Sequence, residues 1–195
     1  MVQVWNQLQE CAMAIFSRNE ANRNGHTVLQ VTSLDSRTGE EELEQLKKAG
    51  VPVEGPVTAC LQARHYRYHK LAEDHEYTVV IIPGSNVPPE AGSTVEGLAT
   101  WASKTYKYAR ARAGIALRLR DLLSVSPELM EKLKLERIIV VHDPTDTRKE
   151  GARVFGVRVE GAEGFLDAYA EDETAYGEGT GFAFIDLHHV WSKRS

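Results

Sequence analysis

Residues 77–97, YTVVIIPGSNVPPEAGSTVEG, have the order of a strand, a glycine-bearing loop and a helix start. The apolar run 79–82 is typical of a strand that is buried on both faces of a sheet. Glycines in the loop let backbone amides approach a ligand closely, and a helix N-terminus favours a phosphate. The candidate ligand-binding residues are Gly84, Ser85, Gly92, Ser93 and Thr94. This order of elements predicts an anion-binding loop.

The loop lacks both standard nucleotide-binding signatures, because no lysine follows the second glycine and the G-x-G-x-x-G spacing is missing. A structural role is the alternative. Pro88-Pro89 would then be a stiff turn, and Ser93 would cap a helix in a capping box with Glu96.

One family has a similar order of residues in this loop. Its segment P-G-G-x-G-T-x-x-E occurs in Lonely Guy-type nucleotide phosphoribohydrolases, which the loop resembles over a small part of the chain. Six additional residues, 86–91, separate the two halves here, Ser85 stands at the second glycine and Ser93 at the threonine. The resemblance implies that the loop holds a phosphate and that Glu96 lies near a ribose.

A second polar group follows the apolar run 138–141. Its members, which could act as acid and base or bind a divalent metal, are His142, Asp143 and Asp146. They would lie at the carboxyl end of a buried strand, where α/β folds place ligands. His188 or His189 could add one further group, because alternation on a strand sends only one of them to a given face. The pattern H-D-P-T-D also suits a simple turn, so both interpretations stay open. With Glu96, these three residues are the candidate catalytic groups.

Other potential metal ligands receive a plainer interpretation. His65 and His69 would share a face of a helix, but on a strand they would stand about 13 Å apart, too far for one metal. We predict solvated histidines and no metal site. The two cysteines, Cys11 and Cys60, are too few for a disulfide framework and are predicted to be reduced core residues.

Opposite charges are concentrated in two stretches. Residues 104–120 contain six basic and no acidic residues, and residues 160–178 contain seven acidic and no basic residues. These stretches are expected to pair within the fold or between copies in a homo-oligomer. The net charge of −5 argues against nucleic-acid binding. An alternative function is therefore a non-catalytic structural, assembly or interaction protein, viral or accessory, that uses the paired surfaces.

Periodicity and capping signals predict the elements that position these residues. Helices are expected over residues 2–20, from the Thr38–Glu41 capping box to Gly50, from Ser93 to about 113, over 117–123, over 126–135 and over 163–170. Strands are expected over residues 27–33, 77–83, 137–142, 153–159 and 181–190. Residues 56–73 fit either a helix or a strand, and a helix is favoured.

Length and composition fit one folded α/β domain spanning residues 1–195, with 42% hydrophobic and 26% charged residues. We expect a three-layer sandwich with a mixed, mainly parallel central sheet and an antiparallel C-terminal extension.

The first sixteen residues lack the pattern of a signal peptide or a membrane span, so a cytoplasmic location without membrane contact is predicted. The leading functional hypothesis is binding or processing of a nucleotide or another phosphorylated small metabolite at residues 77–97.

Overall fold

The computed structural model describes residues 20–21, 24–147, 151–161, 163–170 and 179–187 of the chain. Cys11, His188, His189 and nearly all of the helix predicted over residues 2–20 lie outside the described residues. The α-helices are α2 (Gly39–Lys48), α3 (Gly55–Gln62), α4 (Val95–Tyr106), α5 (Gly114–Val125) and α6 (Glu128–Leu133). The short 3-10 helices are η1 (Arg64–Tyr68), η2 (Gly84–Asn86) and η3 (Pro89–Ala91).

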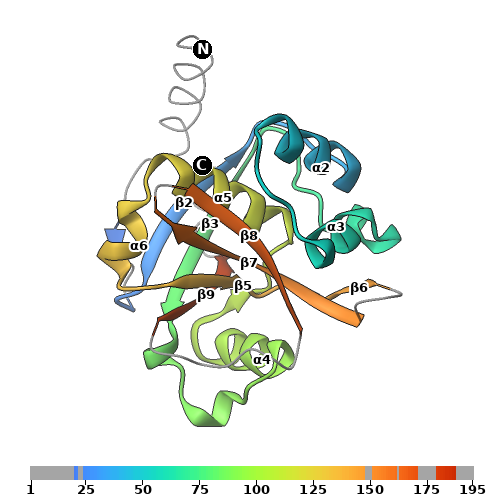
Figure 1. Cartoon of the computed structure of the whole chain (residues 1–195). Coiled ribbons are helices and arrows are strands. Elements are labelled where there is room, and N and C mark those ends of the chain that lie inside the picture. The colour runs from blue at the N-terminus through green and yellow to red at the C-terminus, as the bar shows by residue number, and fades with distance from the viewer. Residues whose placement is uncertain (1–19, 22–23, 148–150, 162, 171–178, 188–195) are drawn as a thin grey trace.

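The described strands belong to one sheet, in the order β1-β2-β3-β9-β5-β7-β6, with β4 beside β9 and β8 beside β7 (Figure 1). They are β1 (Glu20–Ala21), β2 (Thr27–Ser33), β3 (His75–Pro83), β4 (Tyr108–Ala109), β5 (Arg137–Val140), β6 (Thr145–Thr147), β7 (Gly151–Glu160), β8 (Glu163–Ala170) and β9 (Thr180–Asp186). Among these strands only β5 and β9 pair in parallel. The α/β class and the mixed sheet are confirmed, but the expectation of a mainly parallel sheet is wrong.

The direction of β3 changes the geometry expected for the site. β3 pairs antiparallel with β2 and with β9, whereas β5 runs parallel to β9. Pro83, at the end of β3, and Ile138, near the start of β5, both lie opposite Gly181. His142 follows Ile138 by four residues, or about 13 Å of strand rise. The carboxyl ends of β3 and β5 therefore lie at opposite ends of the sheet, whereas two parallel strands would have placed both at the same end.

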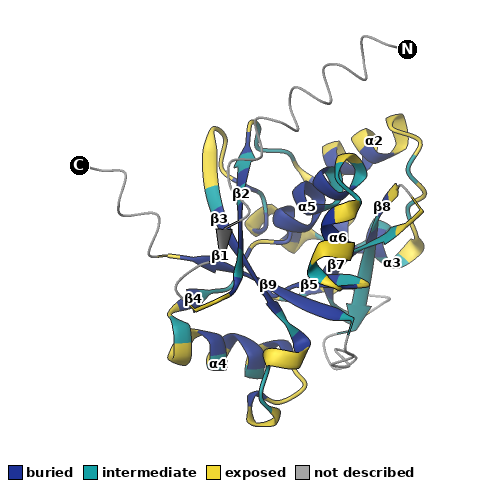
Figure 2. Cartoon of the chain, turned by 90° about the vertical axis from the view of Figure 1, so that its left-hand side faces the viewer, coloured by how far each residue is buried: buried dark blue, intermediate teal, exposed yellow. Residues whose placement is uncertain are grey.

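Alternate residues of the central strands face two separate apolar cores. On one face, side chains of the sheet pack against α2, α3, α5 and α6. On the other face, residues such as Val80, Ile82 and Phe184 pack against α4. Figure 2 shows α4 on one side of the sheet and the other labelled helices opposite it. A three-layer sandwich is not confirmed, because α4 is the only described helix that contributes to the second core.

Several local predictions are confirmed by the described elements. Thr38 and Glu41 form both hydrogen bonds of the capping box that opens α2. Residues 56–73 begin as the helix α3 and continue as the 3-10 helix η1. Cys60 is buried in the core at 1% exposure. Within the part of the chain that the structure describes, no helix is both long and apolar enough to cross a membrane.

Two predicted helices are wrong in type or length. Residues 163–170 form the strand β8, which pairs with β7 from Glu160–Glu163 to Arg153–Ala170. Gly161, with a φ of 63°, lies in the turn before β8. The helix expected to reach residue 113 ends at Tyr106, because Lys107 adopts a left-handed conformation with a φ of 66°. The chain can then turn back and form β4 beside β9.

Candidate functional site

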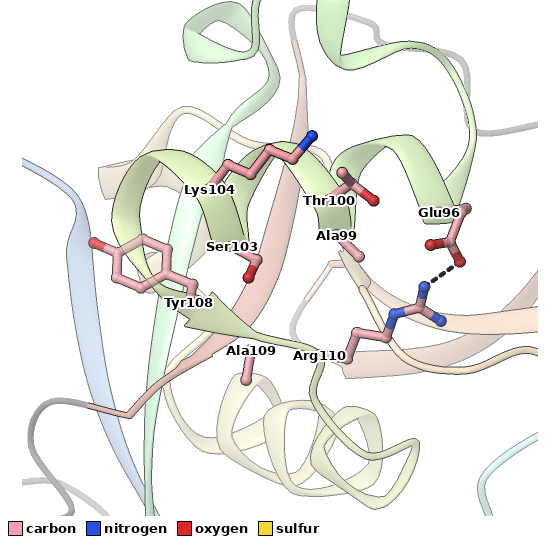
Figure 3. Close-up of a pocket in the computed structure, with 8 residues that line it drawn as sticks. All are labelled: Glu96, Ala99, Thr100, Ser103, Lys104, Tyr108, Ala109 and Arg110. Atoms are coloured by element: carbon pink, nitrogen blue, oxygen red, sulfur yellow. Dashed lines mark hydrogen bonds and ion pairs between the residues drawn. The ribbon is translucent and has the colours of Figure 1, made fainter.

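A hollow of about 330 Å³ lies between α4 and β4 (Figure 3). Val95, Leu98 and Ala102 bury one face of α4 in the second core, so the neighbouring face lies beside β4. The polar residues that line the hollow are Glu96, Thr100, Ser103, Lys104 and Arg110, with Tyr108. The reversal of the chain at Lys107 therefore brings cations and hydroxyls together.

Arg110 connects two residues that the sequence identified separately. Its guanidinium donates to the carboxylates of Glu96, on α4, and Asp143, after β5. The Glu96 and Asp143 side chains are 68% and 74% exposed, whereas that of Arg110 is 28% exposed. Burial lowers the pKa of Arg110, but the hydrogen bonds and charges of the two carboxylates outweigh burial and raise it. Arg110 is therefore a largely buried cation with two exposed counter-ions.

Lys104 is the second cation of the hollow. No carboxylate of the described residues lies within ion-pair distance of its ammonium group. Tyr108 is only 2% exposed and forms part of the wall. Its hydroxyl lies 3.1 Å from both Asn24 Nδ2 and His26 Nδ1, which fixes the ring. The hollow thus combines a fixed aromatic wall with an ammonium group open to a ligand.

His142 lies inside the protein and does not line this hollow. Its Nε2 accepts a hydrogen bond of 2.9 Å from the Phe155 backbone N–H. Nδ1 therefore carries the proton and donates to the Asp143 carbonyl at 2.6 Å. Complete burial is the main cause that lowers the pKa of His142 to about 3. Its ring is neutral at pH 7 and links β5 to β7.

The other predicted acid-base residue and the histidine pair lie apart from the hollow. Asp146, on β6, is exposed between Thr145 and Thr147, which are buried. His65 is exposed, as predicted, but the prediction of a solvated side chain is wrong for His69. His69 is buried against His142, with ring centroids 5.1 Å apart, and burial lowers its pKa. Among the described residues, no group of three or more histidine, cysteine, aspartate or glutamate side chains could hold a metal ion.

The loop between β3 and α4 uses several of its amides internally. The amides of Val87, Ala91 and Gly92 donate to carbonyls within the loop. Gly84 is buried at the start of η2, Ser85 is exposed, and Gly92 has a φ of 74°. These bonds fold the loop into two short turns and leave fewer amides for a ligand than the sequence suggested.

The start of α4 differs by one residue from the prediction. Thr94, rather than Ser93, is the N-cap, and its hydroxyl accepts a hydrogen bond of 3.1 Å from the Gly97 amide. A Cβ atom at Gly97 would lie 2.3 Å from the Ala91 carbonyl oxygen, so the loop packs directly on the first turn of α4. The loop thereby fixes the position of Glu96.

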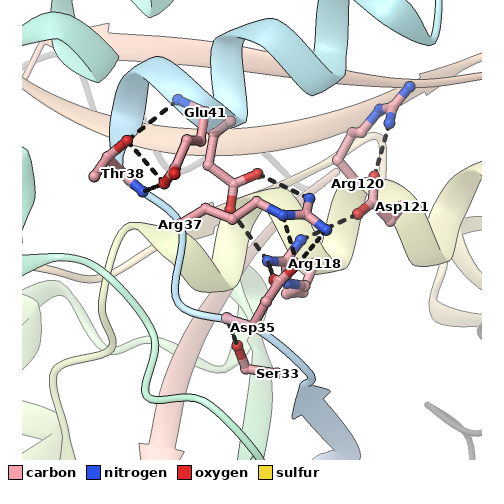
Figure 4. A network of polar contacts seen from close by, with 9 residues as sticks. Ser33, Asp35, Arg37, Thr38, Glu41, Arg118, Arg120 and Asp121 are labelled. Atoms are coloured by element: carbon pink, nitrogen blue, oxygen red, sulfur yellow. Dashed lines mark hydrogen bonds and ion pairs between the residues drawn. The ribbon is translucent and has the colours of Figure 1, made fainter.

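Most of the basic stretch 104–120 is engaged inside the molecule. Arg118 and Arg120 pair with carboxylates around the start of α2 and on α5 (Figure 4). Arg110 pairs as described, and Arg112 donates to the Lys70 carbonyl at 2.6 Å. The stretch is therefore not one continuous basic surface. Sequence reasoning identified neither cation of the hollow, Lys104 or Arg110, as a functional residue, because no motif distinguishes them within this stretch.

Comparison with protein-family models, curated proteins and solved structures gave no match for the chain. The basis for a functional assignment is therefore the set of side chains around the hollow between α4 and β4.

Proposed function

We propose that the protein binds a phosphorylated small molecule in the hollow between α4 and β4. The observation that supports this function best is the convergence of Lys104, Arg110 and the hydroxyl-bearing residues Thr100 and Ser103 on one hollow. Hydrogen bonds between cations and phosphate oxygens are stronger than neutral ones, and a guanidinium can bind two oxygens at once. Two kinds of cation with two hydroxyls suit the several oxygens of a phosphate.

The size and polarity of the hollow favour a small ligand. Its volume of about 330 Å³ lies near the lower end of the range of about 300–1,000 Å³ that is usual for small-molecule sites. A sugar phosphate or a mononucleotide fits this volume better than a dinucleotide. Glu96 lies at the end of the hollow away from Lys104, where its carboxylate could accept hydrogen bonds from sugar hydroxyls (Figure 3). This role agrees with the position of glutamate near ribose that the family resemblance implies.

The loop residues predicted from the sequence have a supporting role in this proposal. Gly84, Ser85, Gly92, Ser93 and Thr94 form or adjoin the two turns and the cap that fix the first turn of α4. The phosphate contacts are assigned to Lys104 and Arg110 instead. The proposal concerns binding, because His142 is neutral with both ring nitrogens engaged and Asp146 lies outside the lining residues.

Replacing Lys104 with glutamine is expected to weaken binding of ribose 5-phosphate about tenfold or more. A hydrogen bond to a charged group contributes about 1.5–3 kcal/mol, and about 1.4 kcal/mol corresponds to a factor of ten. Isothermal titration with inorganic phosphate, ribose 5-phosphate and AMP measures the effect. Lys107→Gln is the matched control, because it removes the same charge from a residue that does not line the hollow. Equal affinities of the two variants, or no binding of these ligands to the unmodified protein, would contradict the proposal.

Glu96→Gln is expected to strengthen binding of inorganic phosphate up to about fivefold. The substitution removes a carboxylate that competes for Arg110, and exposed ion pairs of this kind contribute about 0.2–1 kcal/mol. Ribose 5-phosphate should gain less, because glutamine is a weaker acceptor for sugar hydroxyls than glutamate. The same titrations measure both ligands.

Glu90→Gln, in the exposed turn η3, is the control for the change in net charge. If Glu96→Gln weakened phosphate binding, or if Glu90→Gln had the same effect, competition between the ligand and Glu96 for Arg110 would be refuted.

A further inference from the structure

A second hollow, of about 580 Å³, lies between α6 and the end of β7. Its apolar residues include Met130, Leu135 and Val159, from three different segments. Three exposed carboxylates at its rim are Glu128, Glu131 and Glu136. We call this feature the α6 groove. It combines an apolar floor with an acidic rim.

The carboxylates of the α6 groove lack counter-ions among the residues that the structure describes. Within the described part of the chain, none of the three forms an ion pair. Arg158, next to Val159, pairs with Glu160 and Asp167 instead. Glu128 and Glu131 suit the positive start of α6, but Glu136 follows the helix and has no such role. The rim therefore presents uncompensated negative charge beside an apolar surface.

We propose that the α6 groove of one copy of the protein binds residues 190–194 of a second copy. The sequence of this segment, VWSKR, places two apolar side chains before two cations. Trp191 would pack on the apolar floor, where a methionine adapts readily to an aromatic ring. Lys193 and Arg194 would meet the carboxylates of the rim. Both the apolar and the charged parts of the segment thus have complementary partners.

Chain length indicates that the segment comes from another copy. The Leu135 side chain packs over Gly181, near the start of β9. Leu187, just after β9, lies about 20 Å of strand rise from Gly181. Four further residues to Trp191 span at most about 14 Å. The direct route back along β9 is filled, because Ala183 and Ile185 are buried in the first core. Even fully extended, the four residues leave the backbone of Trp191 about 6 Å short of Gly181, so we take the segment from a second copy.

Sedimentation equilibrium over a range of protein concentrations tests this association on the full chain. We expect reversible self-association that weakens tenfold or more in Trp191→Ser and in the triple variant Glu128→Gln, Glu131→Gln, Glu136→Gln. The matched triple control is Glu40→Gln, Glu44→Gln, Glu73→Gln, which removes three exposed carboxylates elsewhere and should associate like the unmodified protein. A synthetic peptide of residues 188–195 should compete with self-association, and the same peptide with serine at position 191 should not.

A charge exchange separates the proposal from a general loss of folding. Lys193→Glu with Arg194→Glu should abolish association, as should Glu128→Lys with Glu131→Lys and Glu136→Lys. Mixing these two variants should restore a complex, because the charges are again complementary across the contact. A monomeric full chain at every concentration, unchanged association in Trp191→Ser, or failure of the mixture to form a complex would each overturn the proposal.

Discussion

Arg118→Met is expected to lower the free energy of unfolding by about 3–5 kcal/mol, because it leaves a buried carboxylate without its main partner. Arg118 is 6% exposed, and its Nη2 lies 3.1 Å from both Glu42 Oε1 and Asp35 Oδ1. Burial raises the pKa of Glu42, and the charges of Arg118 and Arg37 oppose that effect. Figure 4 shows Arg118 among the side chains of the neighbouring loop and helix. Without Arg118, the ion pair of Glu42 that remains among the described residues is a 3.5 Å contact with Arg37.

Chemical denaturation at pH 7 measures this loss. A second substitution, Glu42→Gln, should recover much of the stability of Arg118→Met, because a neutral amide is less costly to bury than an unpaired carboxylate. Arg64→Met, at an exposed site, should change the free energy of unfolding by less than about 0.5 kcal/mol. If the double variant were as unstable as the sum of the single variants, an unpaired buried charge would not explain the effect.

This ion network shows one limit of sequence reasoning. Arg118 is 83 residues from Asp35 and 76 residues from Glu42 in the chain. The basic stretch 104–120 was expected to pair with the acidic stretch 160–178, within the fold or between copies. Helical geometry places Arg118 on the buried side of α5 instead. Charge patterns along the chain could not show which cations meet carboxylates from other elements.

The direction of the central strands was misjudged for a different physical reason. Residues 79–82 are all 0% exposed, as their apolar run predicted. Burial on both faces is typical of parallel sheets, but it requires only that both faces be covered. Here two apolar cores cover an antiparallel strand. The burial of β3 was therefore predictable, and its direction depended on how distant strands pair.

The strand β8 illustrates how helical spacing can arise in a sheet. A helix was predicted over residues 163–170, which include Phe165, Leu166 and Tyr169, but pairing with β7 decides the local structure. A Cβ atom at Gly164 would lie 2.6 Å from the Arg120 carbonyl, so α5 packs closely on this strand. The sequence could not reveal this contact between distant elements. The capping box of α2, which depends on residues three apart, was predictable.

The candidate site was predictable only in fragments. Glu96 and Asp143 were selected from unrelated local patterns, and the structure brings both to Arg110. Arg110 and Lys104 carried no motif, and their position depends on the left-handed turn at Lys107 and the pairing of β4 with β9. Glu96 and Asp143 could be selected from the sequence, but Arg110, which joins them, could not.

His142→Phe is expected to reduce the loss of stability of the protein in acid. The unfolded imidazole takes up a proton below its ordinary pKa of 6.5, whereas burial keeps the folded ring neutral down to about pH 3. Between these pH values the unfolded state binds more protons than the folded state. The free energy of unfolding therefore has its full value above pH 6.5 and falls as the pH decreases. The contribution of His142 to this fall is roughly 2 kcal/mol at pH 5.

The variant should be less stable than the unmodified protein at pH 7, by about 1–3 kcal/mol, because the Phe155 N–H loses its acceptor. From pH 7.5 to pH 5, however, the free energy of unfolding of the variant should fall by about 2 kcal/mol less than that of the unmodified protein. Denaturation curves across this range measure both effects.

Burial also lowers the pKa of His26 and His69, so both the variant and the unmodified protein keep some pH dependence from those residues. His65→Phe, which replaces an exposed histidine with the same residue, is the control for the substitution itself. Parallel pH profiles for His142→Phe and the unmodified protein would show that His142 is not the buried neutral group that its two hydrogen bonds indicate.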